Sequence, residues 1–381
     1  MERTLFEAEH ESLRQSVREF LDRHVHPRYP EFVEAKSFPR DLWLEAGKQG
    51  FLALQVPEEY GGGGAEDYRF SVAVDEEFAA VSVALSSCFG IHSGVCEPYL
   101  TRLTTPEQKQ RWLPGFCTGE IVTAIGMTEP GGGSDLAALR TTAVRDGDTF
   151  VLSGSKTFIT NGFAADLVIV AARTDPEKGA KGISLFGVEG GMAGFTRGRK
   201  LDKVGQEESD TAELFFEGVR VPAANLIGRL DQGFIHMMTF LPQERLGAAV
   251  SNLAHARQIL AETLQYTKER RAFGQPIGTF QANKFLLAEL VTQVEVTQAF
   301  VDAAVLAHCR GALTAVDAAK AKWWTAQVQG QVLDACVQLH GGYGYMNEYR
   351  VAKAWRDARV TRIWAGSNEI MKELIGRDLG L

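Results

Sequence analysis

Cysteine is scarce in this sequence, with five among 381 residues. The five are odd in number and far apart, and no two form a C-x-x-C pair, so no disulfide framework is expected. Cys88, His92 and Cys96 are spaced i, i+4 and i+8, but their small and apolar neighbours favour a buried helix face over a metal site. The cysteines therefore indicate reduced thiols in an intracellular protein.

Clusters of positive charge are also missing. The formal net charge is -8, and the one dense basic stretch, residues 268–271, is short and mixed in sign. Nucleic-acid binding depends on clustered cations that neutralise phosphates, so nucleic acid is not expected as the main partner. The short stretch suits one small anion instead.

Long apolar runs and the common nucleotide fingerprints are absent too. The first fifteen residues are charged throughout, which excludes a secretory signal, and no uninterrupted apolar run approaches the roughly 18 to 20 residues of a membrane helix. A cytoplasmic protein without a membrane span is expected. Neither G-x-G-x-x-G nor G-x-x-x-x-G-K-[ST] occurs, so a nucleotide would have to be held in another way.

Hydrophobic periodicity divides the chain into three parts. From about residue 7 to 119 the spacing is helical, whereas from 121 to 226 short β-branched and aromatic runs alternate with Gly and Asp turns. From Gly233 onward the spacing is helical again, and no proline follows Pro276. The sequence predicts a mostly α protein with a central, antiparallel β domain and a helical bundle. The expected domains are 1–120, 121–226 and 227–381.

Two turns in the β region have the composition of a ligand site. The loop MTEPGGGSD, residues 127–135, exposes consecutive backbone N–H groups between the hydroxyls of Thr128 and Ser134, a set suited to a polar heterocycle and an acyl or phosphate group. Phe158 and Thr160 place an aromatic face beside a hydroxyl, which fits a flat ring. Taken alone, the first is a turn and the second a strand end.

The stretch from Gln338 to Met371 carries two more such turns. LHGGYG puts three glycines after a helical pattern, so the backbone there can approach another molecule closely. IWAGSNE leads from a loop into a Ser/Asn cap, where the free N–H groups of a helix can face an anion. Without other observations, each is equally a helix end with no ligand.

Together and in this order, these blocks resemble the acyl-CoA dehydrogenases. The resemblance runs from about residue 5 to the end, and LPQERL with AGSNEIMKELIGRDL is most like the long-chain branch. Its blocks are MTEPGGGSD, SKTFITNG, RRAFG with Phe280-Gln281, QLHGGYGY and IWAGSNEIM. It implies a helical N-terminal domain, a β-barrel-like middle domain, a C-terminal four-helix bundle, FAD, and a homotetramer.

The resemblance also implies roles for individual residues. The residues that would hold FAD are Met127, Thr128, Phe158 and Thr160. Those that would reach it from a neighbouring subunit are Arg270, Phe273, Gln281, Gln338, Gly341 and Gly342. FAD would also contact Ser367 and Glu369. The acyl-CoA would meet Ser134, Gly366 and Arg245, the last as a structural or CoA-facing neighbour. Glu369 stands where the family more often has Gln.

The general base cannot lie where many family members have it. That base is a Glu directly before the Gly of the closing motif, and this position is Ala365, which cannot accept a proton. Long-chain and isovaleryl-type members place the Glu on the first long C-terminal helix, which corresponds here to Glu244. Its apolar neighbours would raise its pKa toward neutrality, where a base works well. The alternative is a solvated acid in the first turn of a helix begun by Pro242.

The expected reaction is FAD-dependent α,β-dehydrogenation of a long-chain or branched acyl-CoA to the trans-2-enoyl-CoA. The electrons would pass to an electron-transfer flavoprotein. An acyl-ACP dehydrogenase and an oxygen-using acyl-CoA oxidase or flavin monooxygenase remain alternatives for the same pocket. Ala365 leaves a further one, an inactive paralogue that binds acyl thioesters, and Glu244 is the residue that discriminates between them.

Overall fold

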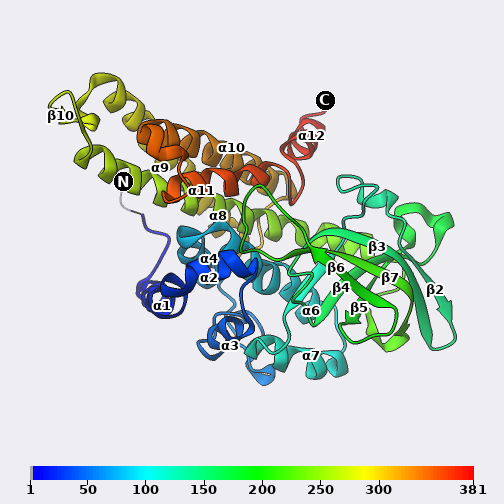
Figure 1. The fold of residues 1–381 in the computed structure, drawn as a ribbon. Helices are drawn as coiled ribbons and strands as arrows, with labels where there is room; N and C mark the ends of the chain where they lie inside the picture. The colour runs from blue at the N-terminus through cyan, green and yellow to red at the C-terminus, as the bar shows by residue number, and fades with distance from the viewer. Residues whose placement is uncertain (1–2) are drawn as a thin grey trace.

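The computed structural model describes residues 3–381. In Figure 1 the sheet lies at the right, and the N-terminal helices and the long C-terminal helices extend to its left. The N-terminal helices are α1 (Ala8–Phe20), α2 (Tyr29–Ala35), α3 (Arg40–Lys48), α4 (Arg69–Val81), α5 (Val83–Gly90), α6 (Glu97–Arg102) and α7 (Pro106–Thr118). Between α5 and α6 lies the wide helical turn η4 (Ile91–Cys96). Ser82 separates α4 from α5, and its Oγ accepts hydrogen bonds from the N–H groups of Ala84 and Leu85. Residues 83–102 thus form one irregular rod that packs against the C-terminal helices.

The middle of the chain folds into an eight-stranded sheet. Its strands are β1 (Thr123–Gly126), β2 (Thr142–Asp146), β3 (Thr149–Thr160), β4 (Leu167–Arg173), β5 (Ile183–Glu189), β6 (Phe195–Lys200), β7 (Thr211–Pro222) and β8 (Leu226–Ile227). They follow the order β6-β7-β3-β2-β4-β5-β8, and β1 pairs with β4. The fully buried strands β4 and β5 carry the core of the sheet.

The sheet differs from the sequence prediction in two respects. It is not wholly antiparallel, because β1 runs parallel to β4, and β2 bridges β4 in parallel at one residue pair. These pairings join segments that are distant in sequence, so local periodicity does not reveal them. The strands are also not all short, because residues 149–160 form the single strand β3, whose register shifts after Leu152 against β7.

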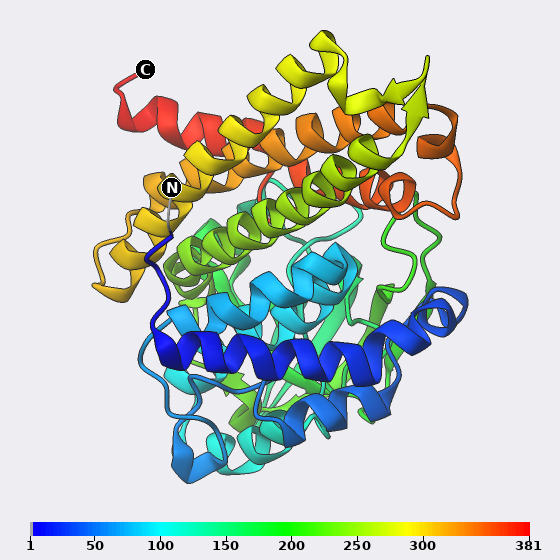
Figure 2. The same ribbon diagram turned by 90° about the vertical axis from the view of Figure 1, so that its left-hand side faces the viewer.

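The C-terminal region contains the long helices of the bundle. They are α8 (Gly233–Glu269), α9 (Gln281–Cys309) and α10 (Ala315–His340), followed by α11 (Arg350–Ala358) and α12 (Asn368–Asp378). A small hairpin of β9 (Arg271–Ala272) and β10 (Gln275–Pro276) links α8 to α9. Figure 2 shows the long helices side by side above the layer of α4 and α1. Helix α11 was not predicted, and α8 begins at Gly233, where the helical spacing of the sequence resumes.

Helix α9 is the most apolar of the long helices. Among the described residues, it alone is long and apolar enough, by length and composition, to cross a membrane, and a third of its most hydrophobic window is buried. Buried and amphipathic helices of other proteins pass the same test. Its outward side carries the exposed side chains of Phe285, Val296 and Phe300.

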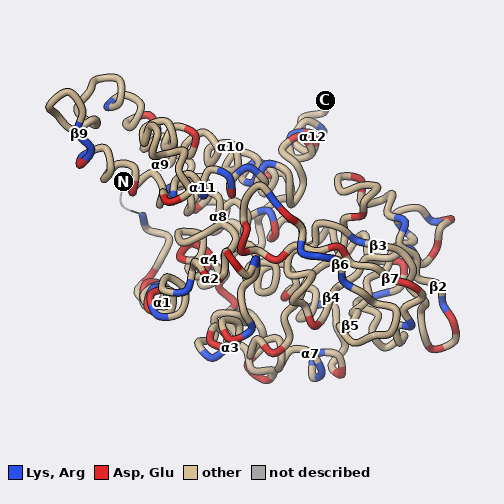
Figure 3. The backbone as a smooth tube through the Cα atoms, viewed as in Figure 1, with Lys and Arg blue, Asp and Glu red and all other residues tan. Residues whose placement is uncertain are grey.

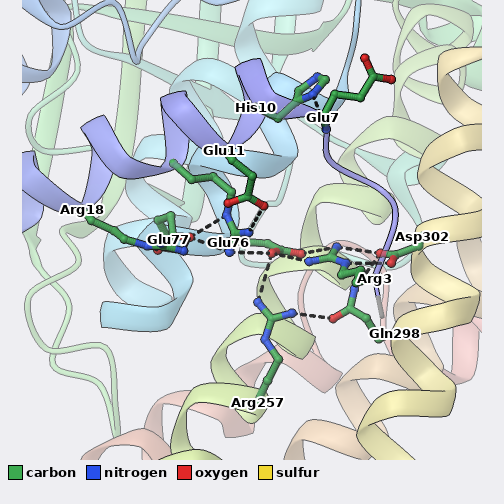
Figure 4. A network of polar contacts seen from close by, with 11 residues as sticks. Arg3, Glu7, His10, Glu11, Arg18, Glu76, Glu77, Arg257, Gln298 and Asp302 are labelled. Carbon is green, nitrogen blue, oxygen red and sulfur yellow. Dashed lines mark hydrogen bonds and ion pairs between the residues drawn. The ribbon is translucent and has the colours of Figure 1, made fainter. Parts of the chain in front are cut away.

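Charged residues of both signs are spread over the fold (Figure 3), and one group of them ties the N-terminus to the bundle. Glu76 of α4 is 2% exposed and accepts two hydrogen bonds from Arg3, at 2.8 and 2.7 Å, and one from Arg257 of α8 at 3.1 Å. Arg3 also donates to Asp302 of α9. Figure 4 shows that these side chains converge from four segments of the chain.

We expect Glu76→Gln to lower the free energy of unfolding at pH 7 by about 3 kcal/mol, because it removes the buried anion that Arg257 and Arg3 share and leaves Arg3 with Asp302 alone. Burial raises the pKa of Glu76, but the hydrogen bond from Arg3 and the charges of Arg257, Arg3 and Arg14 outweigh burial and hold the pKa below its usual value. A carboxyl of lowered pKa stabilises the fold above its unfolded pKa and loses this effect as pH falls. The difference between the two proteins should therefore shrink in acid.

Denaturant unfolding at pH 7 and at pH 4 measures both effects. The matched control is Glu11→Gln, since Glu11 is half exposed and pairs only with Arg14, so its loss should change stability by less than about 0.5 kcal/mol. Equal stability of the Glu76→Gln and wild-type proteins at pH 7 would contradict the assigned role.

Candidate functional site

A carboxyl with an altered pKa lies where α8 passes the rod of residues 83–102. Tyr99 Oη of α6 donates a hydrogen bond of 3.1 Å to Glu244 Oε1. Phe240 and Leu241, both nearly buried, stand one turn before it. Burial raises the pKa of Glu244 to about 7, against the opposing effects of the Tyr99 hydrogen bond and the Arg245 charge. At neutral pH this carboxyl is therefore poised to take up and release protons.

The alternative interpretation of Glu244 as a first-turn acid is wrong. Helix α8 begins at Gly233, and Pro242 lies inside the helix rather than at its start. Glu244 is therefore remote from the helix N-terminus, and the helix dipole does not stabilise its anion. Its surroundings favour the protonated form instead.

The closing turn of the chain borders Arg245, the residue that follows Glu244 on α8. Ala365 and Gly366 adopt φ values of 51° and 85°, the left-handed conformation that makes the turn. A Cβ atom on Gly366 would stand 3.9 Å from Arg245 Nη2, so the residue after Glu244 borders the turn. The structure thus brings Arg245 to Gly366, and Glu244 precedes Arg245 on α8.

Lys322 of α10 is a member of this group that the sequence analysis missed. It is fully buried, and its Nζ donates a 2.6 Å hydrogen bond to the Gly366 carbonyl. Burial lowers the pKa of Lys322 to about 8, and the charge of Arg245 lowers it further, against the charge of Glu369. Arg245 Nε is buried without a partner among the described residues. A lysine within the apolar pattern of α10 was the available sequence signal. The two cations leave this turn rich in hydrogen-bond donors.

Buried side chains hold the start of the glycine-rich loop after β1 in place. Lys156 of β3, fully buried, donates to Glu129 Oε1 at 2.8 Å and to the Met127 carbonyl at 3.3 Å. Glu129 also accepts from the N–H groups of Arg140 and Thr141. The Thr128 carbonyl accepts from Thr157 N. These hydrogen bonds fix the backbone at Met127 and Thr128, which are half-buried. The loop from 130 to 135, which includes Ser134, is exposed.

Phe158 presents an unusual exposed ring beside this loop. Its side chain is 69% exposed and its backbone has φ 59°, a conformation that costs energy for a bulky residue. Thr160 is half-buried at the end of the same strand. An exposed ring held in a strained conformation next to free N–H groups is suited to a flat, polar partner.

A second cluster lies at the other end of α8. A cavity of 480 Å³ is lined by Arg270, Gln338, Gly341 and Gly342, four of the six residues predicted to reach a neighbour's FAD, together with Tyr266, Ile277, Leu339, His340, Tyr343 and Met346. The Arg270 guanidinium lies 5.2 Å from the Tyr343 ring centroid and forms no ion pair with any described residue. Phe273, 95% exposed, and Gln281, also exposed, lie outside the cavity.

The two clusters cannot form one small site within a single chain. Glu244 and Arg270 are separated along α8 by 26 residues, the difference of their numbers, which corresponds to about 39 Å of helix. Ligand sites are usually single clefts of a few hundred Å³. The cavity at Arg270 must therefore bind a different ligand from the site at Glu244, or bind one end of a ligand whose other part is bound by another chain.

The start of α12 carries the last predicted contacts. Ser367 is the N-cap, and its Oγ accepts a hydrogen bond from Ile370 N. Glu369 is exposed, and hydrogen bonds from its own N–H and from Ser367 hold its pKa below the usual value. Asn368, which the sequence analysis missed, is 5% exposed, and its Oδ1 has no partner among the described residues. An unpaired buried acceptor at a helix start is suited to a ligand that donates.

Three comparisons with known proteins agree with this geometry. Family models of the N-terminal, middle and C-terminal domains of acyl-CoA dehydrogenase match residues 7–120, 124–219 and 231–380. The long-chain specific acyl-CoA dehydrogenase of Sus scrofa mitochondria is 45% identical over 99% of this chain and 88% of its own length.

Among solved structures, an acyl-CoA dehydrogenase from Geobacillus kaustophilus is 45% identical, with a TM-score of 0.97 over 99% of both chains. A glutaryl-CoA dehydrogenase from Mycobacterium smegmatis in complex with FADH2 has a TM-score of 0.92 and 27% identity over 98% of this chain and 95% of its own.

The residues of this chain fit FAD. The exposed Phe158 ring and the braced loop after β1 offer a face and hydrogen bonds to a flat heterocycle. Gly341 and Gly342 leave open space where a Cβ would stand, and Arg270 supplies an unpaired cation for an anionic phosphate. The groups that suit the flavin ring thus lie at the loop after β1, and the group that suits the phosphates lies in the cavity at Arg270.

We expect Tyr99→Phe to raise the pKa of Glu244 above its value of about 7, because the Tyr99 hydrogen bond stabilises the carboxylate. Infrared titration of the carboxyl stretch, with Glu244→Gln as the subtraction control, measures that pKa directly. An unchanged or lower value in Tyr99→Phe would show that the hydrogen bond does not set the titration.

Proposed function

Because the chain belongs to the acyl-CoA dehydrogenase family, we propose that it oxidises a long-chain or branched acyl-CoA to the trans-2-enoyl-CoA with Glu244 as the base. The observation that carries the proposal is a carboxyl with apolar neighbours and a pKa of about 7, while Ala365 in the closing turn cannot accept a proton. The 45% identity to a long-chain enzyme over nearly the whole chain supports the substrate class.

The role of Glu244 follows from its environment. Abstraction of the proton next to a thioester carbonyl needs a base that is unprotonated at working pH and basic enough to hold the proton afterwards, which a pKa of about 7 satisfies. Tyr99 Oη orients the carboxylate with one hydrogen bond. FAD, when bound, supplies the acceptor for the hydride that leaves the next carbon.

The closing turn would bind the thioester end of the substrate. Lys322 fixes the Gly366 carbonyl through a buried hydrogen bond and so sets the backbone of the turn. Met371 Cε stands 2.5 Å from the place of a Cβ on Gly366, and φ there is positive, so this position of the turn favours glycine. Arg245, with an unpaired Nε, contributes positive charge beside it, and Ser134 on the exposed loop would contact the CoA part.

The separation of the two clusters supports an oligomer with a shared site. If the flavin lies beside Phe158 in one chain, the Arg270 cavity, about 39 Å from Glu244 along α8, would receive the phosphate end of FAD from another chain. The apolar outward side of α9, with a 470 Å³ hollow beside Trp324, gives such a partner a surface to cover. A homotetramer that passes electrons to an electron-transfer flavoprotein completes the proposal.

We expect Glu244→Gln to keep bound FAD and bind acyl-CoA while losing at least about 10³-fold in the rate of flavin reduction, since general bases contribute roughly 10² to 10⁴. Anaerobic mixing with a panel of straight and branched acyl-CoAs, read by flavin absorbance, measures this rate. The control is Glu269→Gln, the same change at an exposed position of α8.

Full activity of Glu244→Gln would remove Glu244 as the base. Absence of flavin reduction in the wild type with every acyl-CoA would identify an inactive thioester-binding protein. Rapid reoxidation of the reduced wild type in air would favour an oxidase, whereas slow reoxidation and fast transfer to an electron-transfer flavoprotein support the proposal.

Arg270→Ala should weaken FAD retention and oligomer assembly together, because the cavity loses its unpaired cation. Flavin content after gel filtration, with light scattering for mass, measures both. Lys268→Ala removes a charge two residues earlier, outside the cavity, and should change neither. A fully flavinated tetramer of Arg270→Ala would argue against the shared site.

A further inference from the structure

Two polar side chains from the α4 segment converge on α8 one turn beyond Glu244. Gly247 is three residues farther along, which corresponds to about 4.5 Å of helix. A Cβ atom on Gly247 would stand 3.5 Å from Tyr68 Oη and 4.0 Å from Asp75 Oδ2. The phenol and the carboxylate thus approach the same point, close to the proposed base.

Neither group has a hydrogen-bond or ion-pair partner within residues 3–381. Tyr68 is 3% exposed, and its ring packs edge-to-face on His308 at 4.5 Å, but its hydroxyl forms no hydrogen bond. The Asp75 carboxylate forms no hydrogen bond or ion pair with residues 3–381, although the next residue, Glu76, pairs with Arg3 and Arg257. Tyr68 is buried and Asp75 is partly buried, and neither side-chain oxygen is among the fully enclosed atoms that lack a partner. Both oxygens can therefore be reached by a ligand, and an apolar ligand that covered them would leave them unsatisfied.

The surroundings of this pair are rich in acceptors. Burial raises the pKa of Asp75 to about 7, and the negative charge of Glu76 raises it further. Burial likewise raises the pKa of Glu97 on α6 to about 7, against smaller effects of Thr101 and Arg102. The pKa of Tyr68 is raised by burial and by the charges of Asp75 and Glu97, among others. A group that donates a hydrogen bond would therefore be bound here, whereas an anion would be repelled.

Room for a ligand exists on the rod that faces α8. Gly90 and Gly94 have no heavy atom within 4 Å of the place where a Cβ would stand, and both are partly accessible. Gln243 Nε2 approaches the Gly94 carbonyl at 3.4 Å and ties η4 to α8. The open space therefore borders the same stretch of α8 that carries Glu244.

We propose that Asp75 and Tyr68 form a recognition point for a hydrogen-bond donor, a hydroxyl or an ammonium, carried by the acyl chain several carbons beyond the thioester. The inference rests on the proposed function, because it assumes that the acyl chain extends from Glu244 past Gly247. A plain hydrocarbon chain would leave both polar groups without partners, and this cost would select against it. The preferred substrates are thus acyl-CoAs with a polar group in the chain.

The test uses acyl-CoAs with a hydroxyl in mid-chain and shorter acyl-CoAs with a terminal amine, and compares each with the unsubstituted acyl-CoA of the same length. The rate of anaerobic flavin reduction at limiting substrate gives kcat/KM for each with the FAD-loaded wild type. We expect a hydroxyl- or amine-bearing chain to exceed the unsubstituted one by roughly 10- to 100-fold, the worth of one hydrogen bond to a charged group.

Three variants assign the preference to these two residues. Tyr68→Phe removes one hydroxyl and should reduce the preference, whereas Asp75→Leu should abolish it and improve the unsubstituted chain. Asp75→Asn keeps the shape and removes the charge, so it should lose the amine preference and retain part of the hydroxyl preference. Tyr60→Phe, which removes a phenol outside this region, is the control. Flavin content confirms that each variant is folded.

The outcomes separate the two proposals. Oxidation of unsubstituted chains by the wild type with no preference for any polar chain, or a preference that survives in Asp75→Leu, would overturn the recognition point and leave the proposed function standing. Failure of all acyl-CoAs to reduce the flavin would overturn the proposed function itself.

Discussion

The cost of placing an ionisable carboxyl among apolar side chains is the constraint on which the site depends. Water stabilises a carboxylate far better than Phe240 and Leu241 do, so burial raises the pKa of Glu244 to about 7. That environment exists because α8 continues through Pro242 and carries Glu244 away from the helix start into contact with α6. The long helix, the irregular rod opposite it and the Tyr99 hydroxyl all serve to position one side chain.

The neighbouring acids Asp75 and Glu76 show how differently the same chemistry is used a short distance away. Glu76 points toward the N-terminal segment and the bundle, where arginines hold its charge (Figure 4). Asp75, on the adjacent face of α4, points toward Gly247 and has none. A compensated buried charge fixes the packing of segments, whereas an uncompensated one keeps free energy available for binding. The contrast separates the structural role of α4 from its proposed role in recognition.

The sequence predicted features that depend on local pattern and failed where distant segments meet. The order of helices, strands and helices and the exposed glycine-rich loop follow from periodicity and short motifs, whereas the roles of Glu244, Arg245 and Gly366 were implied by the resemblance to the acyl-CoA dehydrogenases. Tyr99 and Lys322 were missed because their contacts with Glu244 and Gly366 arise from packing between distant helices. The parallel pairing of β1 with β4 was missed for the same reason. Strand β6 escaped detection because its sequence, FTRGRK, has no alternating apolar pattern.

The length of α8 has a genetic consequence. Glu244 lies in the first third of the 37-residue helix α8 and Arg270 directly follows its last residue, so a lesion at either residue damages a different cluster. In an assembly whose sites combine the two ends from different chains, a chain defective at Glu244 and another defective at Arg270 together still contain one undamaged copy of each. Two alleles that are each inactive alone would then complement each other when expressed in the same cell.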